Sequence, residues 1–148
     1  MELTKDTKII FLDIDGVLNC AKTMQRHRGI IGIDPYMVAI FNRIIFATDA
    51  KIVLSSTWRL HKDERDEIRS QVMDFIDVTP HLPLKNGYER KERGCEVKAW
   101  LKEHPEITKY AILDDNSDFF PDQPLFKSSW QIGLTEDIAK DVIKHLNK

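Results

Sequence analysis

Residues 9–19 read IIFLDIDGVLN, an apolar run that leads directly into two carboxylates, Asp13 and Asp15, and then a glycine. The run from Lys8 to Asp13 is short and apolar and is bounded by Gly16, which is typical of a fully buried strand. Two carboxylates at the end of such a strand are costly to bury unless something compensates their charge. This stretch therefore predicts a bound ligand, and a divalent cation together with a phosphate would meet the requirement.

Further apolar runs alternate with amphipathic stretches along the chain. The expected strands cover 8–13, 51–55, 110–113 and 127–132, and the expected helices begin at 34–35, within 57–76, at 93–94 and at 135. Residues 19–33 and 77–92 read as loops because they are rich in glycine, proline and charge. Short buried strands alternating with helices predict an α/β fold, a Rossmann-like parallel sheet with helices on both faces.

Bulk composition sets the remaining limits. The 148 residues suit one domain over 1–148, and a net charge of −2 gives no global field toward nucleic acid or membranes. No apolar run reaches the roughly 20 residues of a membrane span, and MELTKDTK lacks a signal-peptide pattern. Cys20 and Cys95 fit a reduced cytoplasmic protein better than a disulfide scaffold, and Cys20 reads as a packing residue. The sequence leaves the oligomeric state open.

Polar residues follow three of the expected strands. Parallel sheets bind ligands beyond the carboxyl ends of their strands. These ends carry Asp13 with Asp15, Ser55, and Asp114 with Asp115. Several carboxylates with open positions for water and phosphate are the ligands that Mg²⁺ prefers.

Three other residue types favour a phosphate at the same place. Gly16 lets the backbone turn sharply and offer N–H groups to an anion. Ser55 adds a hydroxyl, and Arg93 lies at an expected helix N-terminus, where its charge and the helix dipole both attract phosphate. The set suits phosphoryl transfer through an aspartyl-phosphate. One carboxylate attacks phosphorus, and another protonates the leaving oxygen and later activates water.

The motifs DIDGVL, LSS, RG at a helix start and ILDD, in this order, resemble the four motifs of the haloacid dehalogenase (HAD) superfamily. The stretches SSTWR, RGCEVKAWL, HPEITKYAILDDNSDF and GLTEDI look more specifically like the small HAD domains associated with RNA-repair proteins. The resemblance implies that Asp13 is the nucleophile and Asp15 the general acid/base of a phosphatase. It also implies that Ser55 binds the phosphate, and that Mg²⁺ is held by Asp13, the Asp15 carbonyl and Asp115, with Asp114 in support.

Two assignments stay open at this point. The third HAD motif usually has lysine, whereas this chain has Arg93 before Gly94, with Lys91 and Lys98 as rivals. Asp118 is equally consistent with a further metal-site acid and with a cap for the turn that follows it.

The expected segments between the motifs are too short for a separate folded cap, so the resemblance implies a minimal cap and an open site. Candidate substrate-binding cations follow Asp15 in a loop that has no acid, and others follow Ser55. They are Lys22, Arg26, Arg28, Arg59, Lys85, Arg90, Lys91 and Arg93. They favour a nucleotide or a nucleic-acid terminal phosphate as substrate, although charge alone is equally consistent with a solvated loop. The alternatives are a small-metabolite or phosphoprotein phosphatase, and a non-catalytic nucleic-acid-binding or regulatory module.

Overall fold

The computed structural model describes residues 2–82 and 92–148. Its centre is a five-stranded parallel sheet in the order β5-β4-β1-β6-β7. The strands are β1 (Lys8–Leu12), β4 (Lys51–Leu54), β5 (Asp77–Val78), β6 (Lys109–Asp114) and β7 (Leu125–Lys127). The expected α/β parallel sheet is therefore confirmed.

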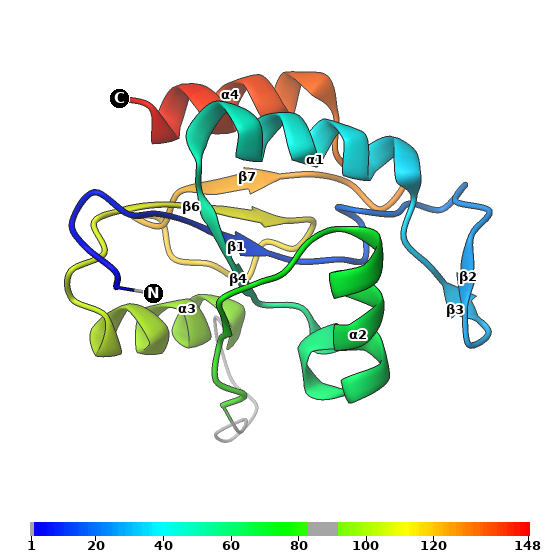
Figure 1. The fold of residues 1–148 in the computed structure, drawn as a ribbon, viewed down its shortest axis with the longest axis horizontal. Helices are drawn as coiled ribbons and strands as arrows, with labels where there is room; N and C mark the ends of the chain where they lie inside the picture. Colours follow the sequence, from blue (N-terminus) through cyan, green and yellow to red (C-terminus); the bar gives the residue numbers. More distant parts are fainter. Residues whose placement is uncertain (1, 83–91) are drawn as a thin grey trace.

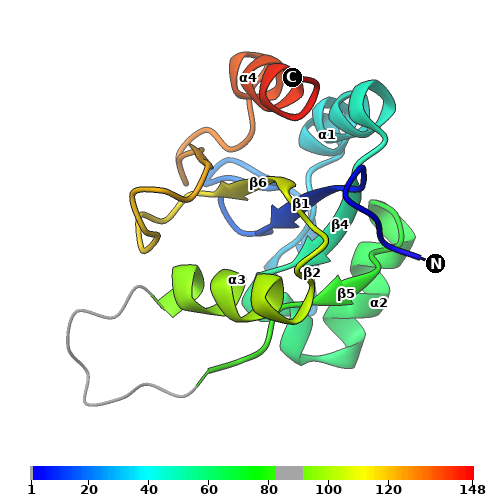
Figure 2. The same ribbon diagram turned by 90° about the vertical axis from the view of Figure 1, so that its left-hand side faces the viewer.

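Helices cover both faces of the sheet (Figures 1 and 2). On one face lie α1 (Pro35–Thr48) and α4 (Glu136–Leu146), and on the other lies α3 (Glu92–Glu103). The alternation of side chains along β1 explains the two layers, because Ile10 and Leu12 pack with Phe41 of α1, whereas Ile9 and Phe11 pack under α3. From Ile9 to Leu12 the central strand is thus apolar, because both of its faces are buried there.

The local signals at helix ends act as the sequence predicts. Asp34 caps α1 by accepting the Tyr36 N–H at 3.0 Å, and Pro35 takes the first helical position. Thr135 caps α4 by accepting the Ile138 N–H at 3.3 Å. These caps fix where each helix leaves the carboxyl edge of the sheet.

The helix expected within 57–76 is confirmed, although it occupies only part of that range. Ser56 caps a short 3₁₀ helix, η1 (Thr57–Leu60), and the α-helix proper is α2 (Lys62–Gln71), which lies beside β5 at the sheet edge (Figure 2). The chain then returns to the sheet, where the Ile76 N–H donates to the Ile52 carbonyl at 2.9 Å. Asp77–Val78, expected within a loop, therefore forms strand β5.

Two other segments differ from expectation. The last strand is Leu125–Lys127 rather than 127–132, because the Ser128 N–H closes the pairing on the Asp114 carbonyl and a turn follows to Gly133. The expected loop 19–33 contains a small antiparallel hairpin, β2 (Arg26–His27) and β3 (Ile30–Ile31). In Figure 1 this hairpin lies at the end of the molecule opposite the two termini. No helix in the described part of the chain is long and apolar enough to span a membrane.

Candidate active site

Three carboxylates meet at the carboxyl edge of the sheet. The pairing of Leu12 with Leu113 places the next residues of β1 and β6 side by side, and the Asp13 N–H donates to the Leu113 carbonyl at 3.0 Å. One carboxylate oxygen each from Asp13, Asp114 and Asp115 lies within 4.8 Å of the others. Asp13 and Asp114 are buried and Asp115 is half-buried. The parallel register therefore produces the acidic cluster that the strand ends predict.

Arg93 supplies the positive charge at this cluster. Its guanidinium Nη1 lies 3.0 Å from Asp13 Oδ1 and 3.1 Å from Asp114 Oδ2. Burial lowers the pKa of Arg93, but the charges of Asp13 and Asp114 outweigh burial and the net shift is upward, so the group stays charged. Of its two rivals, Lys98 is exposed and its Nζ lies over the Phe120 ring, whereas Lys91 lies outside the described residues.

Asp118 fixes the helix that carries Arg93. Its carboxylate Oδ2 accepts the Arg93 backbone N–H at 3.3 Å, and its carbonyl accepts the Gly94 N–H at 3.0 Å. Its other carboxylate oxygen, Oδ1, is buried and has no hydrogen-bond partner among the described residues. Of the two roles left open for Asp118, this geometry favours that of a cap, here at the first turn of α3.

The acidic cluster carries more negative charge than Arg93 balances. Burial, and then the charge of Asp13, raise the pKa of Asp114 to about 8, although Arg93 opposes the shift. The same two causes raise the pKa of Asp115. A hard divalent cation would relieve this repulsion, and three carboxylates form the all-oxygen set that Mg²⁺ favours. Asp13, Asp114 and Asp115 therefore fit the ion that the motif resemblance implies, and the Asp15 carboxylate is outside this group.

The backbone conformation at position 16, and the close approach of Asp115, require a glycine there. Its φ of +85° is in the left-handed region, and a Cβ at this position would overlap the Asp115 carboxylate. The N–H of Gly16 itself donates to Asn19 Oδ1 at 2.9 Å, so any N–H groups that the turn offers to an anion come from its neighbours. Its carbonyl accepts the Ser128 hydroxyl at 2.5 Å. Gly16 thus permits the close approach of Asp115, and its hydrogen bonds are made within the protein.

Asp15 is held by two side chains that the motif comparison did not single out. Asn19 Nδ2 donates to Asp15 Oδ1 at 2.9 Å, and Trp58 Nε1 donates to Asp15 Oδ2 at 3.2 Å. Asn19 is fully buried and also donates to the Gly32 carbonyl, and Trp58 is buried in the core. The signal for Asn19 was available in the sequence, since an amide inside the apolar run of 17–20 needs partners.

Ser55 lies at the end of β4, beside β1. Its N–H donates to the Leu12 carbonyl at 3.0 Å, which brings it next to Asp13. Its hydroxyl is fully buried and has no hydrogen-bond partner among the described residues. An unpartnered buried hydroxyl at the strand end next to Asp13 is consistent with a ligand oxygen as the missing partner.

Arg59 is in the interior rather than at a substrate surface. Its side chain is 3% exposed and forms an ion pair with Glu96 Oε2 at 3.1 Å. Its guanidinium also donates to backbone carbonyls of Ser56, at 2.8 Å, and Thr79, at 3.0 Å. The expected contact of Arg59 with substrate is therefore replaced by a structural role.

Part of the positive charge of the loop 19–33 is balanced by other residues in the structure. Lys22, Arg26 and Arg28 are exposed. However, the Arg28 guanidinium pairs with Asp63 of α2, so its charge is balanced. Arg26 Nη1 donates to the Thr23 carbonyl at 2.8 Å, which orients its side chain along the loop. Lys85 and Arg90 lie outside the described residues.

A covered parallel sheet with an Asp-x-Asp sequence after its central strand and paired aspartates after the neighbouring strand defines a haloacid dehalogenase-type domain. Residues 9–139 match the family described as the HAD domain in Swiss Army Knife RNA repair proteins, and the chain belongs to this family. No significant match came from curated proteins or from solved structures. Membership supports a phosphatase-like hydrolase role and an association with RNA repair.

Proposed function

We propose that the protein is a Mg²⁺-dependent phosphomonoesterase that removes terminal phosphates from nucleic-acid ends through an aspartyl-phosphate. The observation that supports this most is the cluster of Asp13, Asp114 and Asp115 around the Arg93 guanidinium at the carboxyl edge of the sheet. The family supports the substrate class, because the description of its members names RNA repair.

The proposed reaction has two steps. In the first, a carboxylate oxygen of Asp13 forms a bond to phosphorus while the bond from phosphorus to the ester oxygen breaks, and Asp15 gives its proton to that oxygen. In the second, Asp15 takes a proton from water as the water oxygen attacks phosphorus, and the Asp13 carboxylate leaves. Ser55 and Arg93 bind the phosphoryl oxygens, which carry the growing negative charge.

Asp13, Asp115 and the Asp15 carbonyl would hold the metal, with Asp114 in support. When bound, Mg²⁺ supplies charge stabilisation for the phosphoryl oxygens and lets the carboxylates stay ionised together. Asp114 then needs no proton, although its pKa without the ion is about 8.

Mg²⁺ should therefore stabilise the protein in a pH-dependent way. The raised pKa of Asp114 means that the metal-free fold binds its proton more tightly than the unfolded chain does, so its stability falls as pH rises toward 8. Mg²⁺ competes with that proton, so thermal denaturation should show a larger increase in Tm with Mg²⁺ at pH 9 than at pH 6. At pH 9 and about 100 Kd of Mg²⁺ we expect an increase of roughly 5–10 °C.

Two variants show whether the acidic cluster is responsible. Asp115→Ala should lose most of the increase in Tm with Mg²⁺. Asp118→Ala should have a lower Tm without metal, since α3 loses a cap, but should keep the increase. An increase that is equal at the two pH values, or unchanged in Asp115→Ala, would contradict this assignment of the metal site.

The substrate class is tested with two kinds of ester. Replacing Lys22 and Arg26 by glutamine should raise KM for a 3′- or 5′-phosphorylated oligonucleotide about tenfold at low salt and reduce its salt dependence. Hydrolysis of a small aryl phosphate should change less than about twofold, because so small an ester does not reach the loop. On the oligonucleotide the effect should be on KM rather than kcat, because the contacts bind the ground and transition states alike. Arg28→Gln is the matched control, and its effect should be smaller because Asp63 already balances this charge.

The result also separates the proposal from its alternatives. Equal losses on both esters would mean that the loop shapes the site instead of contacting a polymer. No loss on either ester would favour a small metabolite as substrate. Absence of Mg²⁺-dependent hydrolysis of any ester, including both oligonucleotides, would favour a non-catalytic nucleic-acid-binding module.

A further inference from the structure

The Asp15 carboxyl group is held from two sides by neutral donors. Asn19 Nδ2 donates to one of its oxygens at 2.9 Å, and the indole Nε1 of Trp58 donates to the other at 3.2 Å. Asn19 in turn binds the Gly16 N–H and the Gly32 carbonyl. The two hydrogen bonds therefore fix the orientation of the carboxyl plane, and their donors come from different segments of the chain.

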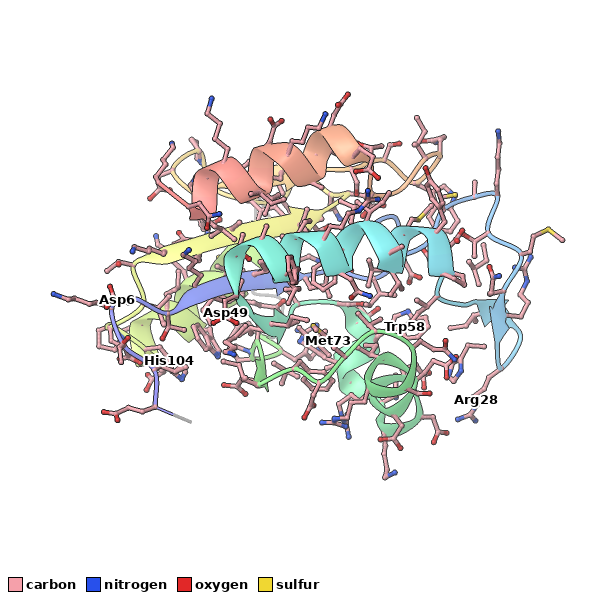
Figure 3. All side chains as sticks on the ribbon, turned by 45° about the horizontal axis from the view of Figure 1, so that its top comes forward. Asp6, Arg28, Asp49, Trp58, Met73 and His104 are labelled. Atoms are coloured by element: carbon pink, nitrogen blue, oxygen red, sulfur yellow. The ribbon has the colours of Figure 1, made fainter. Side chains whose placement is uncertain are left out.

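The structure also fixes the indole itself. Trp58 is 3% exposed and lies in η1, where its backbone N–H donates to Ser56 Oγ at 3.1 Å. The imidazole of His27, on the hairpin, packs against the indole with ring centroids 5.5 Å apart. In Figure 3, Trp58 lies toward the end of the molecule that carries Arg28 of the same hairpin. The direction of the indole N–H is thus set by η1 and the hairpin together.

We infer that Trp58 is a positioning residue for proton transfer by Asp15. This rests on the proposed function, in which the Asp15 proton moves to the ester oxygen as the bond from phosphorus to that oxygen breaks. With both carboxyl oxygens held, the proton is delivered along one direction. Without the indole N–H the group can rotate, and fewer of its orientations reach the leaving oxygen.

A positioning role for Trp58 predicts different kinetic losses on two kinds of phosphate ester. A leaving oxygen that is strongly basic depends on receiving a proton, whereas a nitrophenolate leaves readily without one. The ratio kcat/KM reports the steps up to departure of the leaving group, before hydrolysis of the phosphoenzyme. Loss of the Trp58 N–H should therefore lower kcat/KM about tenfold to hundredfold for an alkyl phosphate and less than about threefold for nitrophenyl phosphate.

Trp58→Phe removes the N–H and keeps an aromatic ring, and Trp100→Phe is its matched control. Both tryptophans are 3% exposed, and Trp100 Nε1 likewise donates to an aspartate, Asp77 Oδ2, at 2.8 Å. Trp100 stacks on His104, which Figure 3 shows at the opposite end of the molecule from Trp58. The control thus loses the same bond and a similar volume, but away from Asp15.

A second variant removes the N–H with almost no change of shape. Benzothienylalanine at position 58 replaces the indole N–H with sulfur in a ring of the same outline, so the packing against His27 is kept. This variant tests the inference even if the smaller phenylalanine leaves a cavity that destabilises the fold.

We expect both position-58 variants to lose activity selectively on the alkyl ester, while Trp100→Phe loses equally little on both esters. Equal losses on the two esters at position 58, or no loss, would overturn the positioning role while leaving the proposed function intact. A wild-type protein that hydrolyses neither ester would overturn the proposed function and the positioning role together.

Discussion

Asp13→Asn should abolish turnover, with a loss of at least about a thousandfold in kcat for aryl phosphate hydrolysis. The amide has nearly the shape of the carboxylate but lacks the oxygen nucleophile, and deletion of a covalent catalyst removes the whole first step. The fold should persist, because the substitution removes one negative charge from a crowded acidic cluster. The measurements are kcat on an aryl phosphate and, for the fold, the thermal denaturation curve.

Trapping of the intermediate gives a direct test of the same prediction. Acid quenching during turnover should leave a phosphoryl group on Asp13 of the wild-type protein, which peptide mass spectrometry would locate, and none on the variant. Asp49→Asn is a suitable control, because Asp49 ends α1 with a φ of 57°, a conformation that asparagine adopts readily. A wild-type rate in Asp13→Asn, or a phosphoryl group on another residue, would show that the nucleophile is wrong.

Arg59→Ala should have the largest effect on stability, a loss of about 3–5 kcal/mol in the free energy of unfolding. The substitution leaves the Glu96 carboxylate buried without its partner, since each side chain of the pair is 3% exposed. It also removes the donors to the carbonyls of Ser56 and Thr79. Urea denaturation followed by circular dichroism would measure the change.

An exposed ion pair provides the comparison. Arg43 of α1 pairs with Glu136, and these side chains are 59% and 46% exposed, so Arg43→Ala should cost less than about 1 kcal/mol. Glu96→Gln, which keeps the shape of the side chain, should be intermediate because Arg59 retains its carbonyl acceptors. If Arg59→Ala and Arg43→Ala were equally stable, Arg59 would not have the structural role that its burial indicates.

Much of the fold could be predicted because its signals are local. The apolar strands at 8–13, 51–55 and 110–113 need no distant partner to be recognised, and parallel pairing then brings their polar ends together. This is why the sequence places Asp13, Ser55 and Asp114 at one edge. The caps Asp34 and Thr135 are local as well. The family match confirms the recognition of the domain from its motifs.

Other features of the fold depend on interactions with residues that are far away in the sequence. Helical spacing alone cannot show that α2 ends at Gln71. The chain beyond it, with Ile76 and Val78, forms hydrogen bonds with β4 instead. The charge pattern of the loop does not reveal that Asp63 balances Arg28 from another element.

The same limit applies to single side chains. Arginines are mostly exposed, so an expectation for Arg59 from its residue type favours the surface. Its burial depends on Glu96 of α3, a residue far away in sequence. Likewise, the tryptophan at position 58 reads as a core residue until its indole N–H is seen to reach Asp15. The roles of Arg59 and Trp58 depend on contacts with residues far away in the sequence. The periodicity of apolar residues carries no information about those contacts.

The lengths of the outer strands have a consequence for how the folded protein meets other chains. The sheet ends in β5, a strand of two residues, and in β7, a strand of three. Each of these strands includes a charged residue, Asp77 in one and Lys127 in the other. Unpaired backbone groups along a long, flat outer strand would invite a neighbouring molecule to extend the sheet, whereas short and charged outer strands discourage it. The apolar central strands would aggregate readily if they were exposed. The short, charged outer strands β5 and β7 thus prevent them from pairing with strands of another molecule.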